Sequence, residues 1–272
     1  MAERVTRFAP SPTGPLHLGH AYAALVAAER GDRFLLRIED IDSSRCTSAF
    51  ESGIYQDLAW LGVTWETPVL RQSDRADAYK AALEHLYNLG VTYSCSCTRG
   101  DIRNALSAPQ EGAALGPDGP IYPGTCRGKT GDGAVRLDVS KAMALLGEVR
   151  FIDTGVCRGT FSFDAEQMQN FVGDVVLARR DIGTSYHLSV VVDDAYQGIT
   201  EVTRGDDLFE ATKIHVLLQR LLGLPTPTYH HHRLIRDDQG KRLAKRDDAR
   251  ALSKYRADGA SPQDIRALVG LA

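Results

Sequence analysis

The stretch RVTRFAPSPTGPLHLGHAYAALVAAERGDRFLLRIE, residues 4–39, decides the fold. It opens with a short segment, 4–9, that predicts a strand, and continues into a loop rich in proline and glycine. Residues 17–30 are rich in alanine and leucine, which predicts a helix. Residues 32–39 have the pattern of a buried strand. Strand, helix and strand in this order predict a βαβ unit, the start of a parallel sheet.

The remaining chain supplies the other parts of an α/β domain. Helix-like segments lie at 46–61, 75–89 and 208–222 and in the tail from 249 onward, with a break at 259–262. Strand-like segments lie at 134–138, 148–153, 175–177, 186–192, 199–204 and 229–235. Residues 95–133 are rich in cysteine, proline and glycine, which predicts an insertion. We therefore predict a parallel-sheet α/β domain in two halves, 1–92 and 180–240, an inserted α+β subdomain at 93–179, and a C-terminal loop with helices at 241–272.

Charge and composition exclude several classes of protein. The chain of 272 residues has 32 Lys and Arg against 35 Asp and Glu, a formal net charge of −3, so an RNA contact would depend on a local basic patch. No stretch approaches the roughly 20 apolar residues of a membrane span. The polar start has no signal-peptide pattern, so we expect a cytoplasmic protein. Five cysteines, an odd number, argue against a disulfide framework.

The strongest chemical motif is His17-Leu-Gly-His20, at the predicted start of the first helix. A helix N-terminus offers free N–H groups and partial positive charge, which suits phosphate. Gly19 lacks a side chain, so a flat base could approach the backbone. In isolation, two histidines near a helix cap without function would be the better interpretation. The preceding strand and loop, together with a second motif, favour nucleotide binding.

That second motif is Arg242-Leu-Ala-Lys-Arg246, which follows a predicted strand and turn. Lysines on such a loop can close over a triphosphate and neutralise charge as pyrophosphate departs. An exposed basic loop is the alternative interpretation when the motif stands alone.

Together the two motifs resemble the HIGH and KMSKS signatures of class I aminoacyl-tRNA synthetases. Residues 7–20, 36–42 and 201–208 resemble the glutamyl branch, and the resemblance covers essentially the whole chain. It implies a class I Rossmann-like domain split by a zinc-containing insertion. A full glutamyl-tRNA synthetase carries anticodon-reading domains after the KMSKS loop, whereas only residues 247–272 follow here. This short form, with Cys-x-Cys in the insertion, is similar to glutamyl-Q tRNA(Asp) synthetases.

The resemblance implies a set of site residues. For glutamate it gives Arg7, Phe8, Ala9, Pro10, Ser11, Glu39, Tyr186 and Arg204. For ATP it gives His17, Gly19, His20 and Lys245, with His17, His20 and Lys245 catalytic and Mg²⁺ arriving with ATP. These residue types suit the ligand glutamate. The guanidinium group of an arginine binds a carboxylate with paired hydrogen bonds, and the Glu39 side chain can pair with the ammonium group of the ligand. Two residues depart from KMSKS. Arg242 replaces the first lysine and keeps its charge, whereas Ala244 replaces the serine and lacks its hydroxyl.

A metal site is predicted at Cys95, Cys97 and Cys126, because zinc favours thiolates. The resemblance supplies Tyr122 as the fourth ligand. The role would be structural, shaping the insertion, and free buried thiols are the alternative.

Three polar clusters receive plainer interpretations. His230-His-His232 is assigned to the strand that enters the KMSKS-like loop, with His231 matching a family histidine. Asp193-Asp194 and Asp206-Asp207 are assigned turn and cap roles instead of metal binding.

The implied reaction has two steps: glutamate and ATP form glutamyl-adenylate, and the glutamyl group then passes to the queuosine base in the anticodon of tRNA(Asp). We expect a monomer. The alternatives are a minimal synthetase that charges tRNA(Glu), a non-catalytic RNA-binding paralogue, and an adenylating enzyme that acts on a small molecule or a protein.

Overall fold

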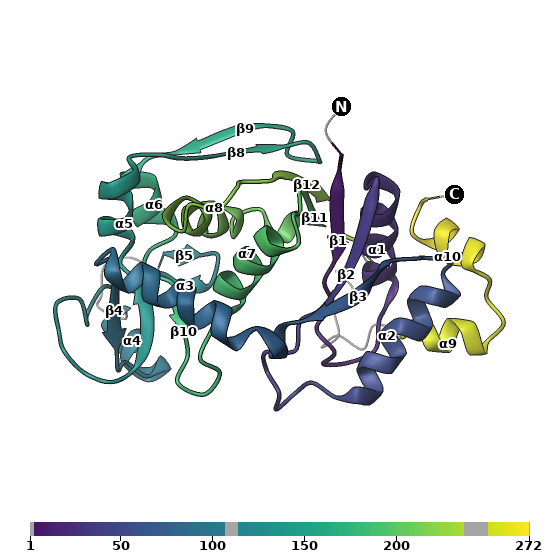
Figure 1. Ribbon diagram of the computed structural model, residues 1–272, viewed down its shortest axis with the longest axis horizontal. Helices are drawn as coiled ribbons and strands as arrows, with labels where there is room; N and C mark the ends of the chain where they lie inside the picture. The colour runs from purple at the N-terminus through teal and green to yellow at the C-terminus, as the bar shows by residue number, and fades with distance from the viewer. Residues whose placement is uncertain (1–2, 107–113, 237–249, 272) are drawn as a thin grey trace.

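The computed structural model describes residues 3–106, 114–236 and 250–271. Its first sheet is parallel, with the order β1–β2–β3 (Figure 1). The strands are β1 (Val5–Phe8), β2 (Arg33–Ile38) and β3 (Glu66–Arg71). Helix α1 (Leu18–Arg30) connects β1 to β2 and packs on β1. The βαβ unit predicted from residues 4–39 is therefore confirmed.

Two histidines fix the start of α1. The side chain of His17 accepts a hydrogen bond from the N–H of Gly19 (3.1 Å), and the side chain of His20 accepts one from the N–H of His17 (3.2 Å). This reciprocal arrangement is a capping box, which satisfies N–H groups that have no partner inside the helix. Three of the six buried residues of the helix are alanine, so these parts of the helix can lie close to the sheet.

The second sheet has the order β11–β12–β8–β9 and lies beside the first. Its strands are β11 (Glu201–Gly205), β12 (Thr228–His232), β8 (Val149–Asp153) and β9 (Gly159–Phe163). The first three are parallel, and β9 folds back on β8. The N–H of Thr200 donates to the carbonyl of Val5 (3.0 Å), and the N–H of Val5 donates to Thr200 Oγ1 (2.8 Å). These bonds join the start of β1 to the residue that precedes β11.

The segment predicted as an insertion, 93–179, contributes to three sheets, one of which is a two-stranded hairpin at 115–120. Strands β8 and β9 join the parallel sheet through β12, whereas a separate antiparallel sheet has the order β10–β7–β4. Its strands and the neighbouring elements are β4 (Thr92–Cys95), α4 (Arg99–Leu106), β5 (Leu115–Gly116), β6 (Gly119–Pro120), β7 (Ala134–Leu137), α5 (Val139–Leu146), α6 (Ala165–Phe171) and β10 (Val176–Ala178). They occupy the left half of Figure 1. The domain boundaries remain a prediction.

Helix α7 (Tyr186–Tyr196) corrects the sequence analysis, which predicted a strand at 186–192. Ser185 caps the helix by accepting a hydrogen bond from the N–H of Leu188 (3.4 Å). Helices α3 (Ala76–Asn88) and α8 (Thr212–Leu221) both pack on it, so its apolar residues are buried on several sides. A continuous apolar run does not distinguish a buried helix from a buried strand, and its β-branched residues favoured the wrong choice.

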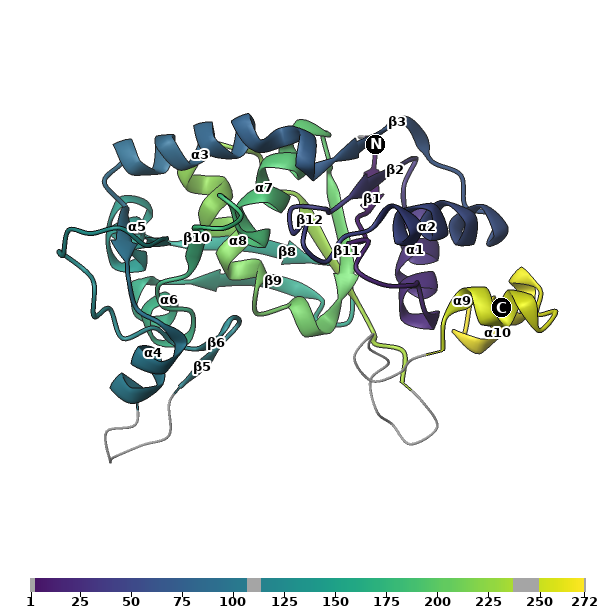
Figure 2. The same ribbon diagram turned by 90° about the horizontal axis from the view of Figure 1, so that it is seen from below.

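Five further helical elements in the described part of the chain complete the fold. They are α2 (Ser48–Trp60), η1 (Gln72–Arg75), η2 (Asp206–Leu208), α9 (Leu252–Ala257) and α10 (Pro262–Leu268). The helix predicted at 208–222 begins later, at Thr212, because η2 and a turn precede it. Helix α9 packs on α2, and α10 packs on α1 (Figure 2). Within the described ranges, every helix is too short or too polar to cross a bilayer.

Candidate active site

A cavity of about 380 Å³ opens at the carboxyl ends of the parallel strands. Its lining includes nine of the residues predicted for glutamate or ATP: Arg7, Phe8, Ala9, His17, Gly19, His20, Glu39, Tyr186 and Arg204. They come from β1, the start of α1, the end of β2, the start of α7 and β11. Open α/β sheets bind ligands at this edge, beyond the carboxyl ends of their strands.

Arg7 is buried and held by three hydrogen bonds. Its Nε and Nη2 donate to the two carboxylate oxygens of Asp194 (2.9 and 3.2 Å), and its Nη1 donates to the carbonyl of Thr203 (3.2 Å). A guanidinium has five N–H donors, so these contacts leave one donor on each terminal nitrogen. Two such donors suffice for a carboxylate.

Arg204 is fixed in the same way by other neighbours. Its Nε donates to His231 Nε2 (3.3 Å), its Nη1 to His215 Nδ1 (2.9 Å) and its Nη2 to Thr212 Oγ1 (2.5 Å). Here too one N–H donor remains on each terminal nitrogen. The cavity is therefore lined by two arginines that keep donors for anionic groups.

Glu39 follows directly after β2, keeps 12% of its side chain exposed and pairs with the buried Arg37. Arg37 Nη2 donates to Glu39 Oε1 (3.1 Å), and Arg37 Nη1 donates to Asp194 Oδ1 (2.7 Å). Burial raises the pKa of Glu39 above its ordinary value, and the nearby arginines only partly offset this effect. For Asp194, Arg7 and Arg37 outweigh the cost of burial and hold the pKa below its ordinary value.

Tyr186 lies at the first turn of α7 and is 36% exposed, and loss of solvent around its phenol in the cavity raises the pKa of that group. The hydroxyl therefore stays protonated at neutral pH and can donate a hydrogen bond.

The His17 and His20 rings lie 3.8 Å apart between centroids, at the N-terminus of α1. A Cβ at position 19 would come within 3.0 Å of His17 Cε1. A side chain there would require the capping ring to shift by a few tenths of an ångström. The structure thus adds a packing reason for Gly19 to the base access predicted from the sequence.

Three predicted residues are not among the described residues that line this cavity. Ser11 lines a neighbouring cavity of about 420 Å³, which shares Glu39 and Tyr186 with the first. The carbonyl of Pro10 accepts a hydrogen bond from the N–H of Glu39 (3.0 Å), so Pro10 fixes the backbone. Lys245 lies outside the described residues, as do Arg242 and Ala244 of the same motif.

Asp193 and Asp194 have a larger role than the turn or cap roles predicted for them from the sequence. Both lie inside α7 and are buried. Asp194 holds Arg7 and Arg37, whereas Asp193 accepts hydrogen bonds from the side chains of Gln72, Arg75 and Tyr79. Two carboxylates directly after an apolar run were the available signal, because buried carboxylates require partners. Asp206 and Asp207 do lie in a short turn, η2.

The three histidines of β12 have separate surroundings. His231 lies between Arg204 and Asp153, His232 lines the main cavity, and His230 contacts Thr154. Burial lowers the pKa of His231 to about 4, so its ring is neutral at neutral pH.

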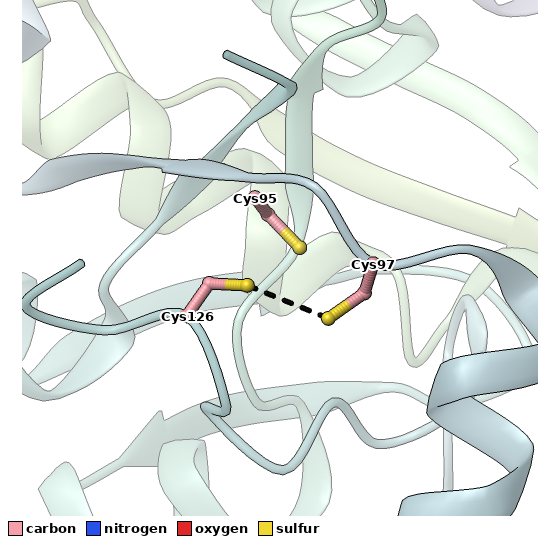
Figure 3. Close-up of side chains that lie close together, drawn as sticks. All are labelled: Cys95, Cys97 and Cys126. Carbon is pink, nitrogen blue, oxygen red and sulfur yellow. Dashed lines mark hydrogen bonds between the residues drawn. The ribbon is translucent and has the colours of Figure 1, made fainter. Parts of the chain in front are cut away.

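Cys95, Cys97 and Cys126 point toward one another (Figure 3), and their sulfur atoms all lie within 4.8 Å of each other. Tyr122 Oη lies 3.3 Å from the sulfurs of Cys95 and Cys97. Tetrahedral zinc with Zn–S bonds of about 2.3 Å places its sulfur ligands about 3.8 Å apart. The Tyr122 hydroxyl lowers the pKa of Cys126 to about 6, which favours the thiolate that metals require. The three thiols therefore form a possible metal site, with Tyr122 beside it.

Comparisons with known proteins agree with this arrangement. Residues 3–272 match the family "tRNA synthetases class I (E and Q), catalytic domain". A protein of Rhodobacter capsulatus named glutamyl-Q tRNA(Asp) synthetase is 62% identical, over 98% of this chain and 100% of its own length. A glutamate–tRNA ligase of Nitratidesulfovibrio vulgaris is 38% identical over 97% of this chain and 56% of its own.

The solved glutamate–tRNA synthetase of Elizabethkingia anophelis has the same fold, with a TM-score of 0.78 and 26% identity. The match covers 98% of this chain and 61% of that one. The family match and the structural match each extend over nearly all of the chain. The chain belongs to the class I tRNA synthetases of the E and Q type, and it matches their catalytic domain.

Proposed function

We propose that this chain activates L-glutamate with ATP and transfers the glutamyl group to the queuosine base in the anticodon of tRNA(Asp). The observation that carries the proposal is a single cavity that holds two arginines with spare donors, an acidic side chain and the histidine-capped start of α1. The names of its relatives support glutamate and tRNA(Asp) as the substrates.

Glutamate has two carboxylates and one ammonium group, and the cavity offers a partner for each. Arg7 and Arg204 would bind the carboxylates through their remaining donors. Glu39 would pair with the ammonium group, and Tyr186 would add a neutral hydrogen bond. Since Asp194, Thr203 and the residues around Arg204 already fix the two guanidinium groups, glutamate meets a prepared site.

ATP would lie against the N-terminus of α1, with Gly19 next to the base. The α-carboxylate oxygen of glutamate attacks the α-phosphorus in line, and pyrophosphate leaves with the electrons of the broken P–O bond. His17, His20 and Lys245 would stabilise the charge on the phosphates. Mg²⁺ would arrive with ATP. The residues act by positioning and electrostatics, and no covalent enzyme intermediate is required.

The second step transfers the acyl group. A ring hydroxyl of queuosine attacks the carbonyl carbon of glutamyl-adenylate, and AMP leaves. The neighbouring cavity that shares Glu39 and Tyr186 is large enough, at about 420 Å³, to admit part of a nucleoside beside the adenylate. We also propose that Cys95, Cys97, Tyr122 and Cys126 hold one structural zinc ion.

The test is transfer of labelled glutamate, with ATP, onto purified tRNA(Asp) with and without queuosine and onto tRNA(Glu). Pyrophosphate exchange without tRNA is measured in parallel. Label on queuosine-containing tRNA(Asp) alone is expected. Label at the 3′ end of tRNA(Glu) would favour the minimal synthetase instead. Intact exchange with no label on either tRNA would keep the first step and reject the acceptor. Absence of both exchange and transfer would reject the whole proposal.

A further inference from the structure

A chain of three hydrogen bonds, two buried and the last part-buried, connects Arg204 to the β5–β6 hairpin. From Arg204 Nη1 it runs to His215 Nδ1 (2.9 Å), from His215 Nε2 to His187 Nδ1 (3.0 Å), and from His187 Nε2 to Asp118 Oδ1 (2.8 Å). His187 and His215 are both buried, on α7 and α8. Asp118 lies in the turn of the hairpin, between β5 and β6.

The direction of each bond follows from Arg204. A guanidinium only donates, so His215 Nδ1 accepts. Burial and the positive charge of Arg204 hold the pKa of His215 well below its ordinary value, so the ring is neutral and its one hydrogen is on Nε2. That hydrogen is donated to His187 Nδ1, which leaves the hydrogen of His187 on Nε2. The chain must therefore end on an acceptor, and the Asp118 carboxylate supplies it.

A second branch holds Arg204 from the opposite direction. Arg204 Nε donates to His231 Nε2, so the hydrogen of His231 is on Nδ1 and is donated to Asp153. Each branch is a histidine path that ends on a carboxylate. The two ends differ in exposure, since the side chain of Asp153 is 0% exposed and that of Asp118 is 49% exposed.

Asp118 also lies at the border of two cavities. It lines the cavity of about 420 Å³ beside Tyr186 and Glu39, and a larger one of about 780 Å³ beside Tyr122 and Arg136. Its hairpin thus stands between the candidate active site and the candidate metal site. Asp118 reaches helix α7 through a part-buried hydrogen bond to His187.

We propose that Asp118, His187 and His215 are positioning residues for glutamate, which fix the guanidinium of Arg204 according to the placement of the β5–β6 hairpin. The inference rests on the proposed role of Arg204 as a glutamate ligand. None of the three residues was singled out by sequence motifs. Their common feature is their place in one series of hydrogen bonds in the folded protein.

The kinetic test compares Asp118→Ala with Asp118→Asn. Alanine removes the terminal acceptor, so the KM for glutamate in pyrophosphate exchange should rise about tenfold, the size of one hydrogen bond to a charged group, with the KM for ATP unchanged. Asparagine keeps an oxygen that accepts from His187 and should restore the glutamate KM to within about twofold. Glu166→Ala removes an exposed carboxylate of the same segment and serves as the matched control. A wild-type glutamate KM in Asp118→Ala would overturn the proposal, as would equal damage in both variants.

A second measurement is independent of activity and needs no variant. Nitrogen-15 NMR of the histidine rings reports which ring nitrogen carries the hydrogen. We expect the Nε2–H form for His187 and His215 and the Nδ1–H form for His231. An Nδ1–H form of His215 at neutral pH would overturn the relay even if glutamate is activated. The expected forms in a chain that does not activate glutamate would instead reject the proposed function and leave the relay intact.

Discussion

Arg7 and Arg204 have lost their side-chain freedom before any ligand arrives. Each long side chain is buried, and its neighbours already engage three of its five donors. An arginine that is ordered only on binding loses roughly 2 kcal/mol of rotamer entropy. In this site the loss occurs during folding, so glutamate gains more from each contact.

The first prediction concerns the shape of the Arg7 side chain. Arg7→Lys keeps the charge but cannot bind Asp194 and a substrate carboxylate with paired hydrogen bonds. We expect the KM for glutamate to rise about 100-fold, the loss of roughly 3 kcal/mol, with the KM for ATP within about twofold. Pyrophosphate exchange measures both values. Arg4→Lys, at a half-exposed position just before β1, is the matched control. An equal rise in both KM values would indicate general damage instead of a lost glutamate ligand.

The second prediction follows from the raised pKa of Glu39. Because burial raises this pKa, Glu39 takes up a proton at a higher pH than an ordinary glutamate, and the neutral form cannot pair with an ammonium group. The KM for glutamate should therefore rise as the pH falls through the raised pKa and stay constant above it. Glu39→Gln should have a high KM that is flat over the same range. Glu66→Gln, which alters an exposed pair with Arg33, should keep the wild-type profile. A wild-type KM that does not change between neutral and acidic pH would contradict the assignment.

At the scale of elements, the sequence predicts best where the signals are local. The β1–α1–β2 unit was predicted because a helix start, a breaker loop and two apolar runs lie next to one another. The strand predicted where α7 lies was wrong, because the apolar run there shows neither helical nor strand periodicity. The burial of α7 depends on α3 and α8, which are distant in sequence. The role of Asp194 was missed for the same reason, since Arg7 lies 187 residues away.

The third prediction belongs to the segment that carries β4 and the candidate metal ligands. The purified chain should contain about one zinc per molecule, as tetrahedral thiolate sites do. Cys126→Ser and Tyr122→Phe should lower the zinc content, the serine variant more strongly, and reduce the melting temperature. Pyrophosphate exchange should persist, because the cluster does not line the main cavity. Cys46→Ser, a thiol outside the cluster, is the control. Full zinc content in Cys126→Ser would contradict the site.

For the whole molecule, buried histidines set the response to acid. Burial lowers the pKa of His215, His230, His231 and His232, with His231 at about 4. In the unfolded chain such groups titrate near pH 6.5, so below that value the unfolded chain binds more protons than the folded one. The stability that these neutral rings contribute is present above about pH 6.5 and is lost as the pH falls toward the folded pKa values.

The fourth prediction is therefore a loss of stability in this window. The free energy of unfolding in urea should fall steadily between about pH 6.5 and pH 4, with His231 alone contributing up to about 3 kcal/mol. His231→Gln should be less stable at neutral pH and show a shallower slope. His85→Gln, at an exposed position on α3, should keep the wild-type slope. Unchanged stability across the window would show that the buried rings take up protons without cost.

The contact between Val5 and Thr200 has a consequence for synthesis of the chain on the ribosome. Strand β1 is synthesised before the other strands. Thr200, which forms hydrogen bonds with Val5 at the start of β1, follows 195 positions later. Until then one edge of β1 is open, and such an edge can pair wrongly with other strands. Arg7 emerges early, but Asp194 and Arg204 are among the later parts of the site. A nascent chain that stops before β11 would therefore have half a glutamate site and an unpaired strand, so we expect such products to be inactive and prone to aggregate.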